Sequence, residues 1–165
     1  MTTIELTVNG KLFCGGVEPR MHLADFLRDK LLLTGTNLGC EQGVCGACTI
    51  MIDGAPARSC IAFSATCDRA EVRTIEHFDK DPVMQELRSA FSAEHALQCG
   101  YCTPGMLVTA WDIVTRVPDA DDARIRYELS GNLCRCTGYD GIVRAIYSVL
   151  EVHRASAHSQ TYSTV

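Results

Sequence analysis

The chain has 165 residues, of which 47% are hydrophobic and 7% aromatic, and its formal net charge is -5. This length suits one sizeable domain or two small ones, and the acidic balance argues against a nucleic-acid partner, which usually requires a basic face. The first residues lack the basic and apolar regions of a signal peptide. No apolar run approaches the roughly 18 residues that span a membrane. We therefore expect a cytoplasmic protein without a membrane partner, whose thiols stay reduced.

Strand and turn signals dominate the first half of the chain. Ile4, Leu6 and Val8 alternate with polar residues, as in a half-buried strand. Asn9-Gly10 and Asp53-Gly54 are strong hairpin signals. In chain order, the patterns predict strands at 4–8 and 12–17, a helix at 23–32, a glycine-rich loop at 34–48, and strands at 49–52 and 71–75.

Helical signals replace strand signals after Asp79-Lys80-Asp81-Pro82. Pro82 suits the first turn of a helix, and Thr103-Pro104 predicts another start, with Thr103 as the N-cap. Pro118 should end that helix, and Gly131 should form a left-handed C-cap after the next one. Four helices are predicted. The first begins at Pro82 and the second at Thr103, the third covers Asp121 to Leu129, and the fourth covers Tyr139 to His153.

The change of pattern predicts an α+β chain with two domains. A β-rich domain should cover residues 1–78 and an all-α domain residues 79–154, followed by a flexible, serine-rich tail at 155–165. Both domains are small, and domains of this size often need a staple in addition to their apolar core. Of the remaining residues, Cys14 and Cys67 are expected to be buried as small hydrophobic side chains, and Trp111 to lie in the core.

Eight of the ten cysteines fall into two sets of four. The first set has the C-x4-C-x2-C spacing, followed by a later cysteine, that is typical of plant-type [2Fe–2S] ferredoxins. The second set combines a C-x2-C pair with a later C-x-C pair. The first set is Cys40, Cys45, Cys48 and Cys60, and the second is Cys99, Cys102, Cys134 and Cys136.

Glycines interleave the first set, at Gly39, Gly43 and Gly46. An anionic cluster needs backbone N–H donors close to its sulfurs, and glycine permits the tight turns that present them. The alternative is a structural zinc ion, which usually binds to paired C-x2-C knuckles, a pairing that is absent here. The spacing therefore favours iron and sulfur over zinc.

The second set is less specific by itself. Its pairs also occur in zinc sites, copper sites and thioredoxin-like redox proteins. Both pairs precede expected helix starts, where helix N-termini favour an anionic group. Iron–sulfur binding is the favoured interpretation, while a zinc-stapled interaction module and a disulfide scaffold stay as alternatives.

Three segments of the sequence resemble signature segments of the molybdenum hydroxylases, the family of xanthine dehydrogenase, aldehyde oxidoreductase and CO dehydrogenase. They are residues 39–49, 98–105 and 131–139, which contain most of the cysteines described above. The resemblance covers about residues 4–153 and is to the small iron–sulfur subunit. It implies a β-grasp ferredoxin domain followed by a four-helix bundle with pseudo-twofold character.

The resemblance also implies partners and cofactors. A large subunit would hold a molybdopterin dinucleotide, expected in its cytosine form, and a medium subunit would hold FAD. The assembly would be a heterotrimer or a dimer of heterotrimers. This chain lacks a glycine-rich dinucleotide fingerprint, in keeping with FAD on a partner.

Residue roles follow from the resemblance by position. The cluster held by the second set would lie nearer the molybdopterin, and the cluster held by the first set nearer FAD. Gln98 would hydrogen-bond the pterin through its amide, and the sulfur of Cys136 would approach the pterin amino group. Electrons would pass from molybdenum through both clusters to FAD, with no catalytic side chain on this chain.

The resulting hypothesis is an electron-transfer subunit of a multi-subunit oxidoreductase that hydroxylates an aromatic N-heterocycle or an aldehyde. One competitor is a standalone two-cluster ferredoxin. Others are the small subunit of a CO dehydrogenase or of an aromatic CoA-thioester reductase.

Overall fold

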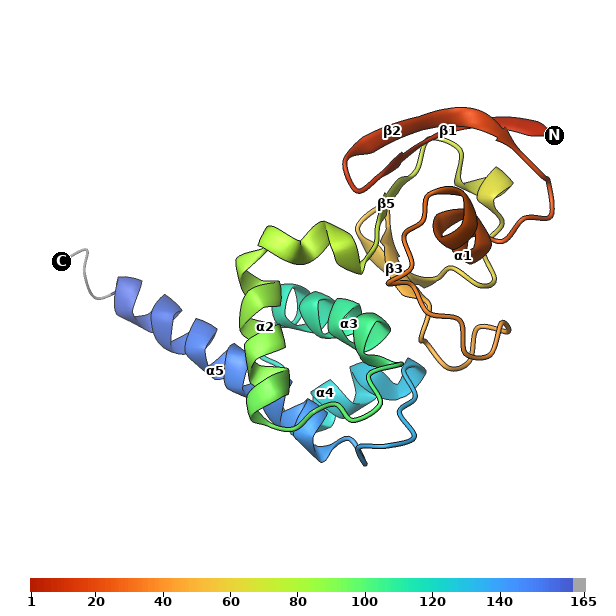
Figure 1. Ribbon diagram of the computed structural model, residues 1–165. Helices are drawn as coiled ribbons and strands as arrows, with labels where there is room; N and C mark the ends of the chain where they lie inside the picture. Colours follow the sequence, from red (N-terminus) through yellow and green to blue (C-terminus); the bar gives the residue numbers. More distant parts are fainter. Residues whose placement is uncertain (162–165) are drawn as a thin grey trace.

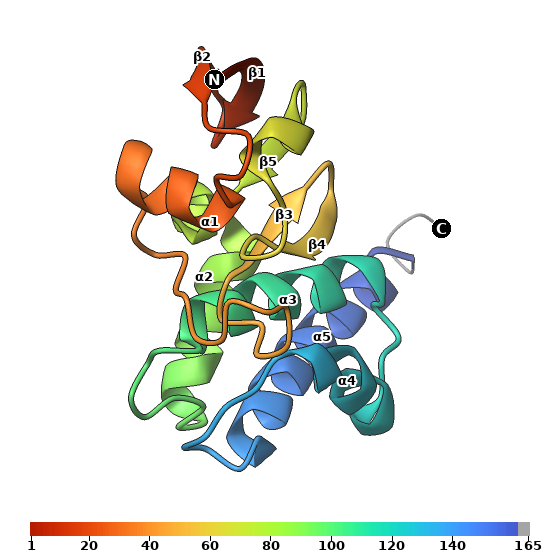
Figure 2. The same ribbon diagram turned by 90° about the vertical axis from the view of Figure 1, so that its right-hand side faces the viewer.

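The structure, a computed structural model, describes residues 1–161, with side chains up to residue 156. Figures 1 and 2 show the β-sheet at one end of the molecule and the longer helices at the other. None of the helices in this described part is long and apolar enough to cross a membrane.

The sheet of the described chain has five strands in the order β2-β1-β5-β3-β4. β1 pairs in parallel with β5, and the other pairs are antiparallel. This mixed sheet together with the helices makes an α+β fold, as predicted. The strands are β1 (Thr2–Val8), β2 (Lys11–Val17), β3 (Thr49–Ile52), β4 (Ala55–Arg58) and β5 (Glu71–Arg73).

Local sequence signals account for both hairpins. Asn9 and Gly10 have φ of 51° and 77°, and Asp53 and Gly54 have φ of 50° and 80°. Two successive positive φ values are what a type I′ turn requires, and Asn-Gly and Asp-Gly supply them with little strain. The predicted hairpins are therefore confirmed.

A short helical segment packs on the sheet. The helix expected at 23–32 forms as α1 (Leu23–Asp25) followed by a π-helical turn at Phe26–Lys30. Phe26 is fully buried, and its ring meets Phe13 of β2 edge-to-face at 4.9 Å. The segment thus closes an apolar cluster with β1, β3 and β5.

The second half of the described chain is built on α2 (Pro82–Ala93), α3 (Thr103–Arg116), α4 (Asp122–Glu128) and α5 (Asp140–Thr161). α2 packs against α3 and α5, and α4 packs against α3 and α5. Their apolar cluster also includes Met51 of β3 and Phe78. Sheet and helices therefore share packing, and the domain division at residue 78 stays a prediction.

Asp81 connects two of these helices. It is the N-cap of α2, where its carboxylate accepts the Met84 N–H at 2.8 Å. The same oxygen accepts the indole N–H of Trp111 on α3 at 3.1 Å. Trp111, expected in the core, is only half-buried and stacks at a tilt on Phe78, with ring centroids 4.9 Å apart.

Three predictions about helix ends differ from the structure. Cys102, not Thr103, is the N-cap of α3. Gly131 does not adopt a left-handed conformation, because α4 is followed by a 3-10 turn at Leu129–Gly131. α5 runs to Thr161, so residues 155–161 of the predicted tail are helical rather than unpatterned, and residues 162–165 lie outside the described part.

Candidate metal centres

The first cysteine set comes together between the 34–48 loop and the residues after β4. The backbone N–H of Cys45 donates to the Cys40 sulfur at 3.3 Å. The Cys48 and Cys60 thiols also contact one another, and both are buried. Cys40 and Cys45 are half-buried. One side of this set is thus enclosed, and the other lies near the surface.

Backbone donors and burial act in opposite directions on these thiols. Hydrogen bonds from the backbone N–H groups of Cys45 and Gln42 lower the pKa of Cys40 to about 6. Burial, together with the Cys48 thiol, raises the pKa of Cys60 to about 11. Since thiolates are the form that binds metal, Cys40 is poised as a ligand, whereas Cys60 requires a cation nearby.

The three predicted glycines serve different contacts. A Cβ on Gly39 would lie 3.0 Å from the Cys45 sulfur, so glycine there lets the backbone approach a ligand. Gly43 has a φ of +78°, and its N–H donates to Cys60. A Cβ on Gly46 would instead meet the Gly131 carbonyl oxygen at 2.4 Å. Gly46 therefore has a role in packing between loops that the sequence interpretation missed.

The second set lies where two loops meet at helix starts. Cys99 and Cys102 precede α3, and Cys134 and Cys136 precede α5. Burial, then the Cys134 thiol, raise the pKa of Cys102 to about 12. Burial opposes ionisation of Cys134 too, but hydrogen bonds from Thr137 and from the backbone outweigh it and lower the pKa.

The thiols approach one another in pairs. Cys40 contacts Cys45 and Cys48 contacts Cys60, while Cys102 contacts Cys134 and Cys99 contacts Cys136. In a [2Fe–2S] cluster each of the two irons takes two protein ligands, so paired thiols fit this group. Among the residues described, no three or more Cys, His, Asp or Glu side chains are placed to hold a single metal ion.

Comparison with known proteins connects this geometry to a family. A [2Fe-2S] binding domain model matches residues 74–147, and a 2Fe-2S iron-sulfur cluster binding domain model matches residues 35–93. The caffeine dehydrogenase subunit gamma of Pseudomonas sp. (strain CBB1) is 50% identical over 88% of this chain and 89% of its own length. The nicotine 6-hydroxylase small subunit of Paenarthrobacter nicotinovorans is 47% identical over 87% of this chain and 86% of its own length.

A solved structure agrees with these sequence matches. The crystal structure of quinoline 2-oxidoreductase from Pseudomonas putida 86 superposes with a TM-score of 0.85 at 48% identity, and the match covers 93% of this chain and 96% of that one. This chain is an iron–sulfur subunit of the molybdenum hydroxylase family. Its cofactors are of the [2Fe–2S] type, and its role is electron transfer within an oxidoreductase.

In this iron–sulfur subunit the two cysteine sets lie on loops that contact one another directly. The Leu133 N–H, next to Cys134, donates to the Cys45 carbonyl at 2.8 Å. On another side, Tyr101, between Cys99 and Cys102, donates its hydroxyl to the Leu38 carbonyl at 2.7 Å. The loops of the two sets thus hold each other at more than one point.

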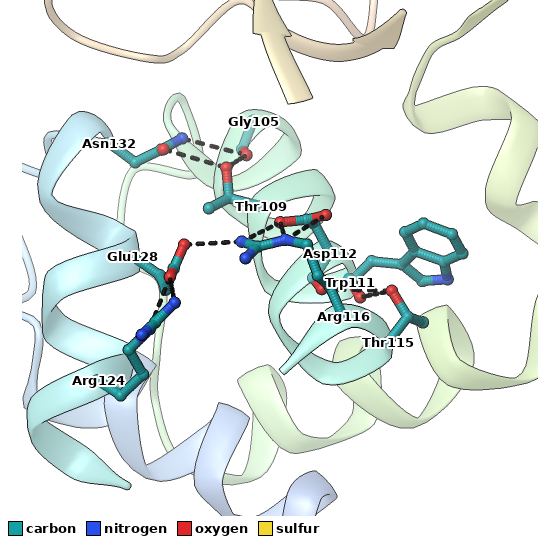
Figure 3. A network of polar contacts seen from close by, with 9 residues as sticks. All are labelled: Gly105, Thr109, Trp111, Asp112, Thr115, Arg116, Arg124, Glu128 and Asn132. Carbon is teal, nitrogen blue, oxygen red and sulfur yellow. Dashed lines mark hydrogen bonds and ion pairs between the residues drawn. The ribbon is translucent and has the colours of Figure 1, made fainter. Parts of the chain in front are cut away.

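The predicted cofactor contacts of the subunit lie at its surface. Gln98 is exposed beside the exposed Cys99, and Cys136 is half-buried. These positions allow a partner to reach them, while the roles assigned to them stay predictions. The sequence interpretation missed three residues that meet at the junction of the two sets, which are Arg58, Thr109 and Asn132. The sequence pointed only to Asn132, through its place in the 131–139 segment that resembles the family. Figure 3 shows Asn132 and Thr109 there.

Proposed function

We propose that the subunit passes electrons from a molybdopterin-bearing large subunit to an FAD-bearing medium subunit. The observation that carries this proposal is that eight thiols form two paired sets on loops in mutual contact. When bound, each cluster takes up and releases a single electron. The proposed ligands are Cys40, Cys45, Cys48 and Cys60 for one cluster and Cys99, Cys102, Cys134 and Cys136 for the other.

The proposal includes the orientation of the subunit between its partners. The exposed Gln98 would present its amide to the pterin, with Cys136 close by, so the second set would face the large subunit. The 40–45 loop has exposed side chains at Glu41, Gln42 and Val44, which supports docking of the medium subunit there. The assembly would be a heterotrimer, single or doubled.

Finer features of the fold belong to the same proposal. Residues 1–78 would form a β-grasp ferredoxin domain, in keeping with the mixed sheet and the packing of α1 on it. Helices α2 to α5 would form a four-helix bundle with pseudo-twofold character. Their mutual packing supports this arrangement.

The proposed substrate is an aromatic N-heterocycle. The relatives described above, at 47% to 50% identity, are named for caffeine, nicotine and quinoline, which are nitrogen heterocycles. The pocket that selects the substrate would lie on the large subunit. Hydroxylation there would release two electrons, which this subunit would pass on one at a time.

The test is purification of the tagged subunit from its native cell, followed by metal, flavin and substrate assays. We expect about four irons per chain, molybdenum and FAD in equal amounts, and two larger chains. Caffeine, nicotine or quinoline should bleach the visible absorption of the complex, and a Gln98→Ala variant should bleach more slowly.

Iron without molybdenum, FAD or partners would favour a free ferredoxin. Zinc without iron would overturn both, and bleaching by aldehydes alone would overturn the substrate class.

A further inference from the structure

A buried polar cluster occupies the junction between the two cysteine sets. Asn132, Thr49 and Thr109 are only 2%, 3% and 6% exposed. Polar side chains this deeply buried require hydrogen-bond partners. In this subunit the partners come from both sides of the junction, as the amide of Asn132 shows.

Asn132 satisfies both ends of its amide. The oxygen Oδ1 accepts from Thr109 Oγ1 at 3.0 Å and from Arg58 Nη2 at 3.2 Å. The orientation of the amide follows from these contacts, because the oxygen faces donors and the nitrogen faces acceptors. The nitrogen Nδ2 lies 3.2 Å from each of three oxygens, which are Gly46 O, Thr49 Oγ1 and Gly105 O.

Arg58 completes the cluster from the end of β4. Its Nη2 donates to the Gly131 carbonyl at 2.5 Å, and its Nη1 donates to Thr49 Oγ1 at 2.6 Å. The guanidinium presents its donors in a rigid planar fork, so these contacts restrain direction as well as distance. Arg58 therefore links the sheet to the loop that leads to Cys134.

Three glycines bring the backbones at this junction into close contact. A Cβ on Gly46 would lie 2.4 Å from Gly131 O, and a Cβ on Gly105 would lie 2.3 Å from Gly46 O. A Cβ on Gly131 would lie 2.4 Å from Arg58 Nη2. At Gly46 and Gly105 the near atoms are backbone carbonyl oxygens, so no atom larger than hydrogen fits there, whereas at Gly131 the near atom is the end of the Arg58 side chain. The backbone carbonyls and the Asn132 amide are therefore packed directly against one another.

Each segment in this cluster also carries a cysteine. Gly46 follows Cys45, and Arg58 stands two residues before Cys60. On the other side, Gly105 lies three residues after Cys102, and Asn132 lies two residues before Cys134. The cluster therefore connects segments from both sets within three residues of a predicted ligand.

We propose that Asn132 and Arg58 are positioning residues that fix the separation of the two cysteine sets and thereby the rate of electron exchange between the groups bound there. This inference rests on the proposed function. The exchange concerns one electron, lost on one side and gained on the other, with no bond formed and no proton released. Electronic coupling falls steeply with separation, so a loosened junction should slow the exchange while both sites still bind iron.

The test compares conservative variants in the purified complex. Asn132→Asp keeps the shape and the acceptor oxygen but cannot donate to the Gly46 and Gly105 carbonyls. Arg58→Lys keeps the charge but loses the planar fork. The matched control is Arg154→Lys, since Arg154 also donates to two carbonyls, those of Pro118 and Ala120. Its contacts lie far along the chain from both sets.

Electron paramagnetic resonance of the fully reduced complex provides the decisive readout. Magnetic coupling between two reduced clusters depends on the inverse cube of their separation, so its splitting reports distance independently of turnover. We expect Asn132→Asp and Arg58→Lys to retain the iron content and both cluster signals, with a reduced splitting and slower equilibration of an injected electron. Arg154→Lys should match the wild type in both measurements.

Unchanged splitting and equilibration in both junction variants would overturn the inference. If Asn132→Asp fails to assemble, Arg58→Lys and Thr109→Val decide the question by the same readouts, since valine keeps the shape of threonine and loses the hydroxyl that contacts Asn132 Oδ1 and Gly105 O. A wild-type subunit without two cluster signals would instead contradict the proposed function. The two failures are therefore distinguishable.

Discussion

Gly46 is required at its position for two separate physical reasons. Its φ of +72° lies in the left-handed region, where a Cβ strains the backbone. A Cβ would also meet Gly131 O at 2.4 Å. Gly54, in the second hairpin, shares the first constraint with a φ of +80°, but nothing lies within 4 Å of its Cβ position. A comparison of the two positions therefore distinguishes the cost of backbone strain from the cost of steric overlap.

We expect Gly46→Ala to destabilise the subunit more than Gly54→Ala. Both variants bear the left-handed cost of about 1–2 kcal/mol, and only Gly46→Ala adds the overpacking cost of about 1–3 kcal/mol. Thermal denaturation of the two iron-loaded variants measures the difference, with iron content as a second readout. Equal losses would show that the junction relaxes freely around an added methyl group.

Single residues also show where the interpretation of the sequence was incomplete. Cys67 is buried, as predicted, and burial raises the pKa of its thiol. Cys14 was predicted to be buried but is exposed, because it lies on the face of β2 opposite Phe13, across from the exposed Glu5 of β1. Cys67 lies in a 3-10 turn that packs on the apolar cluster of the sheet, so its burial depends on tertiary contacts that no local pattern shows.

At the scale of elements, an ion network joins α3 to α4. Figure 3 shows Arg116 between Asp112 and Glu128. Its Nη2 lies 2.7 Å from a carboxylate oxygen of each, and Asp112 is only 4% exposed. Hydrogen bonds from Arg116, and then from Arg124, lower the pKa of Glu128 despite its burial. The charged form of Glu128 is therefore favoured in the folded subunit.

This shift predicts a pH-dependent effect of Glu128→Gln. A lowered pKa in the folded state contributes stability above the unfolded value of about 4.5, and the contribution is lost as the pH falls through the folded value. At pH 7 we expect a loss of roughly 1 kcal/mol, because both arginines are about half exposed. The difference in melting temperature from the wild type should close below about pH 4.5.

Scanning calorimetry between neutral and acid pH measures this difference. The control is Glu151→Gln, since Glu151 is exposed on α5, and its variant should follow the wild type throughout. If the melting temperature of Glu128→Gln is lower than that of the wild type by the same amount at every pH, Glu128 stabilises the subunit through packing rather than through its charge.

Local patterns predicted the elements better than their ends. Strand alternation and the Asn-Gly and Asp-Gly turns act within a few residues, so both hairpins and the helix start at Pro82 follow from the sequence. The left-handed cap expected at Gly131 did not form, since a 3-10 turn ends there and the Gly131 carbonyl accepts from Arg58. A contact with a partner 73 residues away has no local signal.

At the scale of the whole molecule, most predicted cluster ligands lie in segments without helix or strand. The segments are the 34–48 loop, residues 98–102 and residues 132–139. Such segments lack the regular backbone hydrogen bonds of helices and strands, so their order depends on tertiary contacts and on bound metal. The described apolar clusters of the sheet and the helices, in contrast, consist mainly of aliphatic and aromatic residues away from these loops.

Removal of iron by a chelator and a reductant should therefore loosen the loops first. A loss of about 3 kcal/mol would lower the melting temperature of a chain of this size by roughly 6–12 °C. Hydrogen exchange should accelerate at 34–48, 98–102 and 132–139, while β1 and α3 stay protected. An equal acceleration of hydrogen exchange over the whole chain would contradict the idea that bound iron stabilises the loops separately. Reconstitution with iron and sulfide is the control.

The sequence by itself determined the α+β class, the hairpins, the two cysteine sets and the resemblance to a family, because these depend on short-range periodicity and on spacing. Only the tertiary structure decided how the thiols pair and which residues join the two sets. Arg58, Thr109 and Asn132 come from three separate segments. Their contacts form only when sheet and helices pack together, and the free energy of that packing depends on residues far apart in the chain.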